Sequence, residues 1–375
     1  MNSFDKITKK LGFGCMRLPR GEDKRPDFDK FTELVDYFME NGFNYFDTAH
    51  SYHNGDSEIA LRECLVKRYP RESFVLTNKL STFFFEKEEE IRPLFESQLE
   101  ACGVDYFDFY LMHAQGRELY DKYKRCRAYE TALELMREGK FRHFGISFHD
   151  KAEVLREILT DYPEIEVVQI QLNYADYDDP SVDAKRCYEV CREFDKPIIV
   201  MEPVKGGNLV NLPDEAEAVF RALGDASTAS YAIRYAAGFE GVFMVLSGMG
   251  SLDMVRDNVG YMKDFLPLGK TELDAIDRVK DIFSKMELIA CTACRYCVDG
   301  CPQNILIPDI FACMNKKKLW KNWNIDYYYG LSTRDHGRAG DCIGCAACEA
   351  VCPQHLNIRE LLAAASVEFD KKEDK

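Results

Sequence analysis

The chain has 375 residues, a length that is too great for one small domain and too small for three. Hydrophobic residues make up 46% of it. Its net charge of −15 lacks the basic footprint that nucleic acids and anionic membrane surfaces require, so we expect neither as a partner. The opening segment MNSFDKITKK is polar, and no stretch reaches the roughly 18 apolar residues of a membrane-spanning helix. We therefore expect a soluble, cytoplasmic protein.

Short apolar runs alternate with amphipathic stretches from residue 11 to about residue 265. The runs are predicted strands at 11–16, 43–49, 73–80, 106–113, 141–147, 167–174, 197–203 and 241–248. The stretches between them predict helices, for example at 29–42, 88–103 and 128–140. Eight such units in about 250 residues favour a TIM (β/α)8 barrel. A doubly wound open sheet is the competing fold, and it is disfavoured because no G-x-G-x-x-G turn follows a predicted strand.

The last hundred residues differ in pattern from the barrel region. One more amphipathic helix is predicted over 270–286, so we divide the chain into a barrel domain, 1–268, and a second domain, 269–375. The segment ILIPDIFACMNKKKLWKNW (305–323) has a helical pattern, its basic run 316–323 is interpreted as a solvated helix face, and a Tyr-rich loop follows. We expect this second domain to be small and mostly α-helical.

Two cysteine motifs dominate this second domain. CTACRYCVDGCP (291–302) and CIGCAACEAVCP (342–353) both read C-x-x-C-x-x-C-x-x-x-C-P. In two-cluster ferredoxins the first three cysteines of such a run bind one cluster, and the cysteine before Pro binds the other. One predicted [4Fe–4S] cluster therefore has as ligands Cys291, Cys294, Cys297 and Cys352. The ligands of the second are Cys342, Cys345, Cys348 and Cys301, so each motif gives its last cysteine to the cluster of the other (crossed ligand sets). With these motifs the second domain resembles a helical, two-cluster ferredoxin-like module.

Other interpretations of the cysteines are weaker. Structural zinc sites need only four ligands each, usually as separated C-x-x-C pairs. A disulfide framework does not suit an intracellular chain. The cysteines outside the two motifs follow no pattern, and we expect them to be buried apolar residues: Cys15, Cys64, Cys102, Cys126, Cys187, Cys191 and Cys313.

Polar side chains stand at the ends of three successive predicted strands, in NYFDTAHSY, VLTNKL and YLMH. Together with LGFGCMRLP near the start, these motifs resemble the aldo-keto reductase family over residues 11 to about 265. The resemblance implies four catalytic residues, Asp47, Tyr52, Lys79 and His113. All four lie at or just past the carboxyl end of a strand, where barrel enzymes place their chemistry.

Elementary acid–base chemistry gives each of these residues a role in reducing a carbonyl. A free tyrosine has a pKa of about 10 and is a poor proton donor at neutral pH, and a neighbouring ammonium lowers that pKa. We expect Tyr52 to be the general acid and Lys79 to lower its pKa. Asp47 is expected to keep Lys79 charged, and His113 to orient the carbonyl.

The resemblance also implies a nicotinamide cofactor, NADP or NAD, bound across the barrel mouth without a Rossmann domain. The candidate contacts are Cys15, Met16, Ser147, Gln171, Lys205, Gly207, Gly248, Arg256 and Asn258. The chain departs from the family at Phe148, where Asn is usual, and at Met201, where an aromatic residue is usual. The Lys and Arg that bind the 2′-phosphate of NADP have no clear counterparts, although Arg256 and Lys205 are substitutes. A flavin, or no nucleotide, stays open.

Hydride transfer moves two electrons, whereas an iron–sulfur cluster moves one, so three functions are compatible with the sequence. The first is an oxidoreductase that reduces a carbonyl or oxidises an alcohol, with the clusters relaying electrons to or from a ferredoxin or other electron-transfer protein. The second is a plain carbonyl reductase with an architectural cluster domain. The third is an electron-transfer subunit with a non-catalytic barrel, which the intact set of four residues disfavours.

Overall fold

A computed structural model describes residues 3–179, 182–286, 288–289, 291, 295–319, 324–352 and 356–370. The chain forms two compact units. The first comprises Met1–Gly206 and Ala229–Glu272, and the second comprises Gly207–Thr228 and Leu273–Lys375. The predicted domain boundary after residue 268 stays a prediction, and the grouping of 207–228 with the C-terminal residues is a feature that the sequence did not indicate.

The described residues of the first unit include eight parallel strands that close into a barrel in the order β1 to β8. They are β1 (Leu11–Gly14), β2 (Tyr45–Asp47), β3 (Val75–Leu80), β4 (Phe107–Gln115), β5 (Phe141–Phe148), β6 (Val167–Gln171), β7 (Ile198–Met201) and β8 (Val242–Ser247). Closure is made by β8 pairing with β1, where Gly12 is opposite Leu246. The TIM-barrel prediction is therefore confirmed, because an open sheet would leave both strands as edges.

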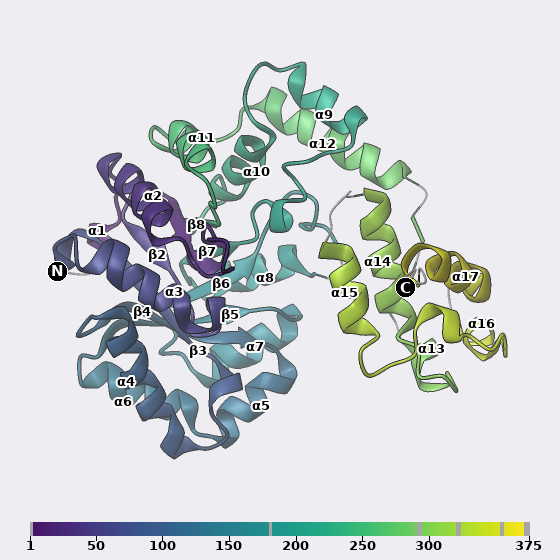
Figure 1. Ribbon diagram of the computed structural model, residues 1–375, viewed down its shortest axis with the longest axis horizontal. Helices are drawn as coiled ribbons and strands as arrows, with labels where there is room; N and C mark the ends of the chain where they lie inside the picture. Colours follow the sequence, from purple (N-terminus) through teal and green to yellow (C-terminus); the bar gives the residue numbers. More distant parts are fainter. Residues whose placement is uncertain are drawn as a thin grey trace. The chain divides into compact units, whose positions relative to one another are not determined.

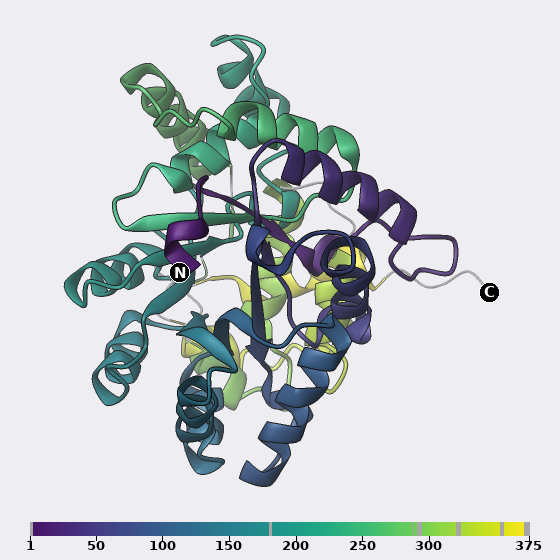
Figure 2. The same ribbon diagram turned by 90° about the vertical axis from the view of Figure 1, so that its left-hand side faces the viewer.

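Helices surround the barrel (Figures 1 and 2). They are α1 (Ser3–Lys6), α2 (Phe28–Glu40), α3 (Asp56–Leu61), α4 (Ile91–Cys102), α5 (Arg117–Arg125), α6 (Ala128–Arg137), α7 (Ala152–Asp161), α8 (Ala184–Glu193), α10 (Thr228–Ala237) and α11 (Leu252–Met262). The three helices predicted between strands correspond to α2, α4 and α6. Helix α2 begins after Asp27, whose carboxylate accepts from the backbone N–H of Lys30, and Gly42 follows its end at φ 81°.

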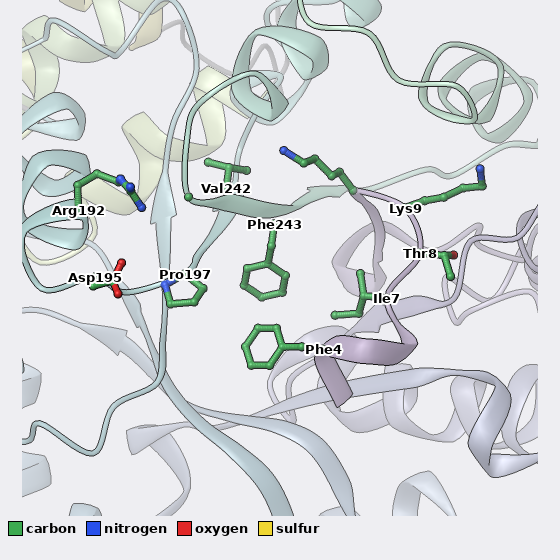
Figure 3. A pocket seen from close by; sticks show the side chains of 11 residues that line it. Phe4, Ile7, Thr8, Lys9, Arg192, Asp195, Pro197, Val242 and Phe243 are labelled. Carbon is green, nitrogen blue, oxygen red and sulfur yellow. The ribbon is translucent and has the colours of Figure 1, made fainter. Parts of the chain in front are cut away.

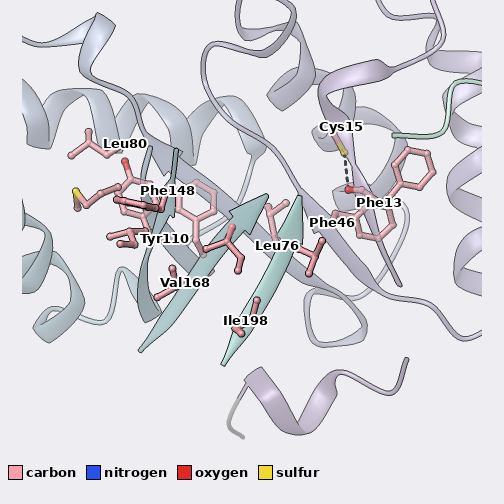
Figure 4. Packing of buried hydrophobic residues seen from close by; sticks show 14 of the residues in the cluster. Phe13, Cys15, Phe46, Leu76, Leu80, Tyr110, Phe148, Val168 and Ile198 are labelled. Carbon is pink, nitrogen blue, oxygen red and sulfur yellow. Dashed lines mark hydrogen bonds between the residues drawn. The ribbon is translucent and has the colours of Figure 1, made fainter. Parts of the chain in front are cut away.

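Side chains of each strand alternate between the barrel interior and the layer beneath the helices, because successive side chains of a strand point to opposite faces. The interior layer contains Tyr45, Val75, Phe109, Leu111, Val167, Ile199, Met244 and Leu246. The outer layer includes Phe13, Phe46, Leu76, Tyr110, Val168 and Ile198 (Figure 4). The same alternation continues to the carboxyl ends of the strands. There, the side chains on the interior side are Asp47, Lys79, His113, Ser147 and Gln171.

The second unit is helical in its described parts. Its helices are α9 (Asp214–Arg221), α12 (Lys270–Lys285), α13 (Tyr296–Asp299), α14 (Ile307–Leu319), α15 (Asn324–Ser332), α16 (Ala347–Ala350) and α17 (Ile358–Phe369). The helix predicted over 270–286 is α12. The helical pattern of 305–323 is α14 as far as Leu319, and residues 320–323 lie outside the described residues.

The predicted Tyr-rich loop is wrong, because this segment forms α15. The buried Tyr329 stacks its ring on Phe369 at 4.4 Å between centroids, and its hydroxyl donates to Asp370 at 2.7 Å. These tertiary contacts outweigh the modest helix propensity of a tyrosine run. Within the residues that the structure describes, no helix combines the length and apolarity needed to cross a bilayer.

The cysteines outside the two motifs are all buried, as predicted. Burial raises the pKa of the Cys187 thiol to about 12, and it raises the pKa of Cys102 well above the usual range. Thiols of this kind are unreactive at neutral pH, because the thiolate is the reactive form.

Candidate functional site

An ion pair between Asp47 and Lys79 lies at the carboxyl ends of β2 and β3. Lys79 Nζ donates to Asp47 Oδ1 at 2.6 Å and to the carbonyl oxygen of Thr48 at 2.8 Å. Lys79 is fully buried and Asp47 is 2% exposed. Burial is the largest single influence on the pKa of Lys79 and lowers it, but the charges and hydrogen bonds of Asp47 and Tyr52 together outweigh that effect and raise the pKa above its usual value. The barrel mouth therefore contains a buried ammonium group.

Tyr52 and His113 lie beside this ion pair. Tyr52 is in the turn after β2, and its ring centroid is 5.0 Å from Lys79 Nζ. The rings of Tyr52 and His113 meet edge to face with centroids 5.9 Å apart. The structure thus brings together four residues from the ends of three successive strands, which is the arrangement that the motifs predicted.

The pKa of Tyr52 differs from the expectation. Burial raises it above 10, although the Lys79 ammonium lowers it, as expected, and the burial effect is the larger of the two. Our expectation considered the cation and not the desolvation of the phenolate. Tyr52 is consequently a phenol at neutral pH, and it carries the proton that a general acid needs.

His113 is held as a neutral imidazole. Burial and the positive charge of Lys79 lower its pKa to about 3. Its Nδ1 lies 2.5 Å from Ser81 Oγ, and its backbone N–H donates to the hydroxyl of Tyr123 at 3.0 Å. These contacts fix the orientation of the ring at the barrel mouth.

Two of the predicted cofactor contacts are joined through Asp176, which is 1% exposed. Gln171 Nε2 donates to Asp176 Oδ2 at 2.8 Å, and Lys205 Nζ pairs with Asp176 Oδ1. Ser147 Oγ accepts from the backbone N–H of Ala114 at 2.8 Å, and its hydroxyl proton can still be donated to a ligand. Lys205 is thus already neutralised by a carboxylate, which weakens it as a partner for a phosphate.

Two of the predicted cofactor contacts near β8, Asn258 and Arg256, also interact with other residues of the protein. The Asn258 amide donates to Ser247 Oγ at 2.7 Å and accepts from the hydroxyl of Tyr261 at 2.6 Å. Arg256 is exposed and lies 3.7 Å from an oxygen of Asp253. Asn258 therefore ties α11 to β8, and Arg256 is a solvated side chain.

Three further predicted cofactor contacts, Cys15, Met16 and Gly207, lie in surroundings that differ from one another. The Cys15 thiol is buried in the outer layer and donates to the carbonyl oxygen of Phe13 at 3.6 Å (Figure 4), so it points into the core. Met16 is 59% exposed next to it. Gly207 has φ 99° and belongs to the segment grouped with the second unit.

Arg17 was not predicted as a site residue. It lies against Gly206, in the loop after β7, and Gly248, in the loop after β8. A Cβ atom added to Gly248, which follows β8, would be 3.2 Å from Arg17 Cβ. A Cβ atom added to Gly206, in the loop after β7, would be 3.3 Å from Arg17 Nη2. The only sequence signal was its place in LGFGCMRLP, just past the first strand.

A cavity of about 460 Å³ lies at the end of the barrel opposite to the four residues (Figure 3). Its walls include Phe4, Ile7, Pro197 and Phe243, near the amino ends of β1, β7 and β8. The Phe4 ring packs edge to face on Phe243 at 5.1 Å. Residues at this end of a TIM barrel usually serve stability, so we assign no chemistry to the cavity.

In the second unit, four motif cysteines line one cavity: Cys301, Cys342, Cys345 and Cys348. Ile305, Ile343 and Arg359 also line it. The backbone N–H of Ile305 donates to Cys301 Sγ at 3.5 Å, a contact of the kind that tunes cluster sulfurs. Cys301 thus lies with three cysteines of the other motif, and the crossed ligand sets stay a prediction.

The other ligand set is described only in part, because Cys294 lies outside the described residues. Cys297 is buried, whereas Cys291 and Cys352 are partly exposed. Among the described side chains, no three His, Cys, Asp or Glu groups have the arrangement of a single-ion site.

The two motifs fold alike. Arg295 and Ala346, at equivalent positions, are both left-handed, with φ 64° and 61°, and a four-residue helix follows each. The N–H of Cys301 donates to the carbonyl of Val298, and the N–H of Cys352 donates in the same way to Glu349. The longer helices α14 and α17 also begin at equivalent residues. The sequence repeat is therefore a structural repeat.

A closed (β/α)8 barrel with Asp, Tyr, Lys and His grouped at its carboxyl end defines a barrel oxidoreductase. Residues 10–281 match the model of the Aldo/keto reductase family, and the chain belongs to this family. Residues 281–357 match the model of the 4Fe-4S dicluster domain.

Individual relatives resemble the barrel region. The NADH-specific methylglyoxal reductase of Escherichia coli is 25% identical over 56% of this chain and 68% of its own length. The glyoxal reductase of Bacillus subtilis is 29% identical over 54% of this chain and 65% of its own. An aldo-keto reductase from Klebsiella pneumoniae in complex with NADPH is 18% identical, with a TM-score of 0.57 over 72% of this chain and 90% of its own, so it shows the fold alone.

Proposed function

We propose that this protein reduces a small carbonyl compound, or oxidises the corresponding alcohol, with NADP or NAD. The observation that carries the proposal is the buried Asp47–Lys79 pair next to the Tyr52 ring. A reaction that converts a carbonyl to an alkoxide needs a proton donor and a nearby positive charge. This site supplies both in a water-poor environment.

Each of the four residues then has a defined task. Tyr52 donates its proton to the developing alkoxide, and the Lys79 ammonium stabilises the phenolate that remains. Asp47 keeps Lys79 protonated and fixed. His113, neutral and held by Ser81, donates a hydrogen bond to the carbonyl oxygen without competing as an acid.

A bound nicotinamide would supply the hydride. Gln171 and Ser147, at the ends of β6 and β5, are the proposed partners of its carboxamide, and Arg17 is a proposed partner of its phosphates because it lies beside Gly206 and Gly248. The relative with NADPH and the NADH-specific relative support a nicotinamide cofactor without deciding between the two forms.

We further propose that the second unit holds two [4Fe–4S] clusters, which supply one-electron storage. One ligand set is Cys301 with Cys342, Cys345 and Cys348, and its support is their common cavity. The other set is Cys291, Cys294, Cys297 and Cys352. Cys345 is exposed, which suits electron exchange with a ferredoxin-type partner.

The test is an anaerobic titration of the iron-replete protein with NADPH and then with NADH, while the visible absorbance of the clusters is recorded. Bleaching without added flavin supports an electron relay between barrel and clusters. Nucleotide binding without bleaching favours a plain reductase with an architectural cluster domain, and the search then turns to methylglyoxal and related carbonyls. Absence of any nucleotide binding contradicts the proposal.

The matched variant is Tyr52→Phe, which keeps the ring and removes the proton. We expect carbonyl reduction to fall by a factor of about 10² to 10⁴, the usual contribution of a general acid. Tyr69→Phe, which loses a hydrogen bond to Asp36 outside the site, is the control and retains activity. A Tyr52→Phe variant with full activity would favour an electron-transfer subunit.

A further inference from the structure

Strand β2 ends before its neighbour β3. The two strands pair from Tyr45 opposite Val75 to Asp47 opposite Thr77, and the N–H of Thr48 donates to the carbonyl of Thr77 at 2.9 Å. β3 continues to Leu80, past the end of β2. Buried backbone groups on such a strand edge require other partners.

Side chains provide these partners at Lys79. Its backbone N–H donates to Asn78 Oδ1 at 2.8 Å, and its carbonyl oxygen accepts from Gln98 Nε2 at 2.9 Å. The hydroxyl of Tyr110 donates to Gln98 Oε1 at 2.6 Å, which fixes the amide of Gln98 from its other end. The backbone of Lys79 is therefore held by side chains beneath α4.

Both amides converge on Glu58 of α3, a fully buried carboxylate. Glu58 Oε1 accepts from Asn78 Nδ2 at 2.7 Å and from Gln98 Nε2 at 3.3 Å. Its other oxygen, Oε2, lies 2.6 Å from His50 Nδ1. One carboxylate thus contacts the two side chains that hold Lys79 and a residue of the loop that carries Tyr52.

A fully buried carboxyl group such as Glu58 is costly unless hydrogen bonds and a nearby cation compensate it. The hydrogen bond that His50 donates to Glu58 raises the pKa of His50 above its usual value, against the opposing effect of burial. His50 stands two residues before Tyr52 and its side chain is 25% exposed. The contact between His50 and Glu58 therefore links the interior network to the Tyr52 loop.

We propose that Glu58 is a positioning residue that sets the spacing between Tyr52 and the Lys79 ammonium. It acts on Lys79 through Asn78 and Gln98 and on Tyr52 through His50. A glutamine at this position has an NH2 group in place of one of the two oxygens, so it cannot accept both at the position of Oε1, facing Asn78, and at the position of Oε2, facing His50. The inference rests on the proposed carbonyl reduction.

The test compares Glu58→Gln with Glu63→Gln in the full-length protein, using methylglyoxal with NADPH and with NADH. Glu63 pairs with Arg62 and Lys67 on the surface and lies outside the network, so its variant is the control. For Glu58→Gln we expect kcat to fall about tenfold to 100-fold with KM nearly unchanged, because small displacements at a reacting centre cost that much. The basic limb of the pH profile should move to higher pH, since a more distant Lys79 lowers the pKa of Tyr52 less.

Three results would overturn the inference. They are an unchanged kcat, a KM that rises in place of the fall in kcat, and a pH profile that does not move although thermal stability falls. If Glu58→Gln does not fold, His50→Gln removes the charge and keeps a donor to Glu58, and it must shift the same limb.

A separate measurement distinguishes this inference from the proposed function. If the wild-type protein turns over no carbonyl with either nucleotide, the proposed function fails. Hydrogen exchange of the peptide that contains Lys79 still tests the network. Exchange that is faster in Glu58→Gln than in Glu63→Gln supports it, and equal exchange overturns it.

Discussion

Lys79 Nζ lies 2.6 Å from Asp47 Oδ1, and neither side chain is more than 3% exposed. Because the two residues lie near the carboxyl ends of adjacent strands and share the interior alternation, the barrel itself sets their distance. Removing one partner of such a pair leaves a buried charge without compensation.

Asp47→Asn should therefore destabilise the protein by about 3 to 5 kcal/mol and abolish most of its activity. The measurement is denaturant unfolding under anaerobic conditions, together with turnover of methylglyoxal. Asp36→Asn is the control, because Asp36 pairs with Arg68 at 2.6 Å on the surface and such pairs contribute about 1 kcal/mol or less. Equal losses in the two variants would contradict the role of burial.

His113 makes stability depend on pH. Its pKa is lowered from 6.5 to about 3 in the folded state, so below pH 6.5 the unfolded chain takes up a proton that the folded chain does not. The free energy of unfolding should fall by about 1.4 kcal/mol on this account between about pH 7.5 and about pH 5.5. In His113→Gln, the free energies of unfolding at the two pH values should differ by about 1.4 kcal/mol less than they do in the wild type. Unfolding curves recorded at both pH values measure this difference. A difference identical to that of the wild type would show that His113 titrates normally.

Arg17 should contribute to nucleotide binding. Arg17→Gln is expected to raise the Kd of NADPH about tenfold, the effect of losing one charge-assisted hydrogen bond. Fluorescence titration measures this without turnover. Arg20→Gln, in the same N-terminal segment, is the control, and equal affinities of both variants would remove Arg17 from the cofactor site.

The crossed ligand sets predict how cysteine replacements combine. Cys301→Ala and Cys342→Ala should each remove the same cluster, so each variant loses about four of the eight iron atoms. The double variant should lose no more iron than either single variant. Cys301→Ala combined with Cys291→Ala should lose both clusters. Iron analysis and electron paramagnetic resonance distinguish the cases, and Cys313→Ala, a buried cysteine outside the motifs, should lose none. Retention of one full cluster in the Cys291/Cys301 variant would place both cysteines on the same cluster.

The sequence by itself determined the barrel and the position of its polar residues. Strand periodicity and the motifs at the ends of β2, β3 and β4 depend on local side-chain patterns, which are visible in one dimension. The same holds for the cysteine motifs, whose equivalent left-handed residues Arg295 and Ala346 adopt one local conformation in both copies.

The tertiary structure decided what depends on distant contacts. The helix α15 exists because Tyr329 packs against Phe369 and Asp370, and the raised pKa of Tyr52 follows from burial that no motif reports. Glu58 reaches the backbone of Lys79 only through amides from other elements. Desolvation and side-chain networks are properties of the packed chain, so they become visible only after the strands and helices are placed in space.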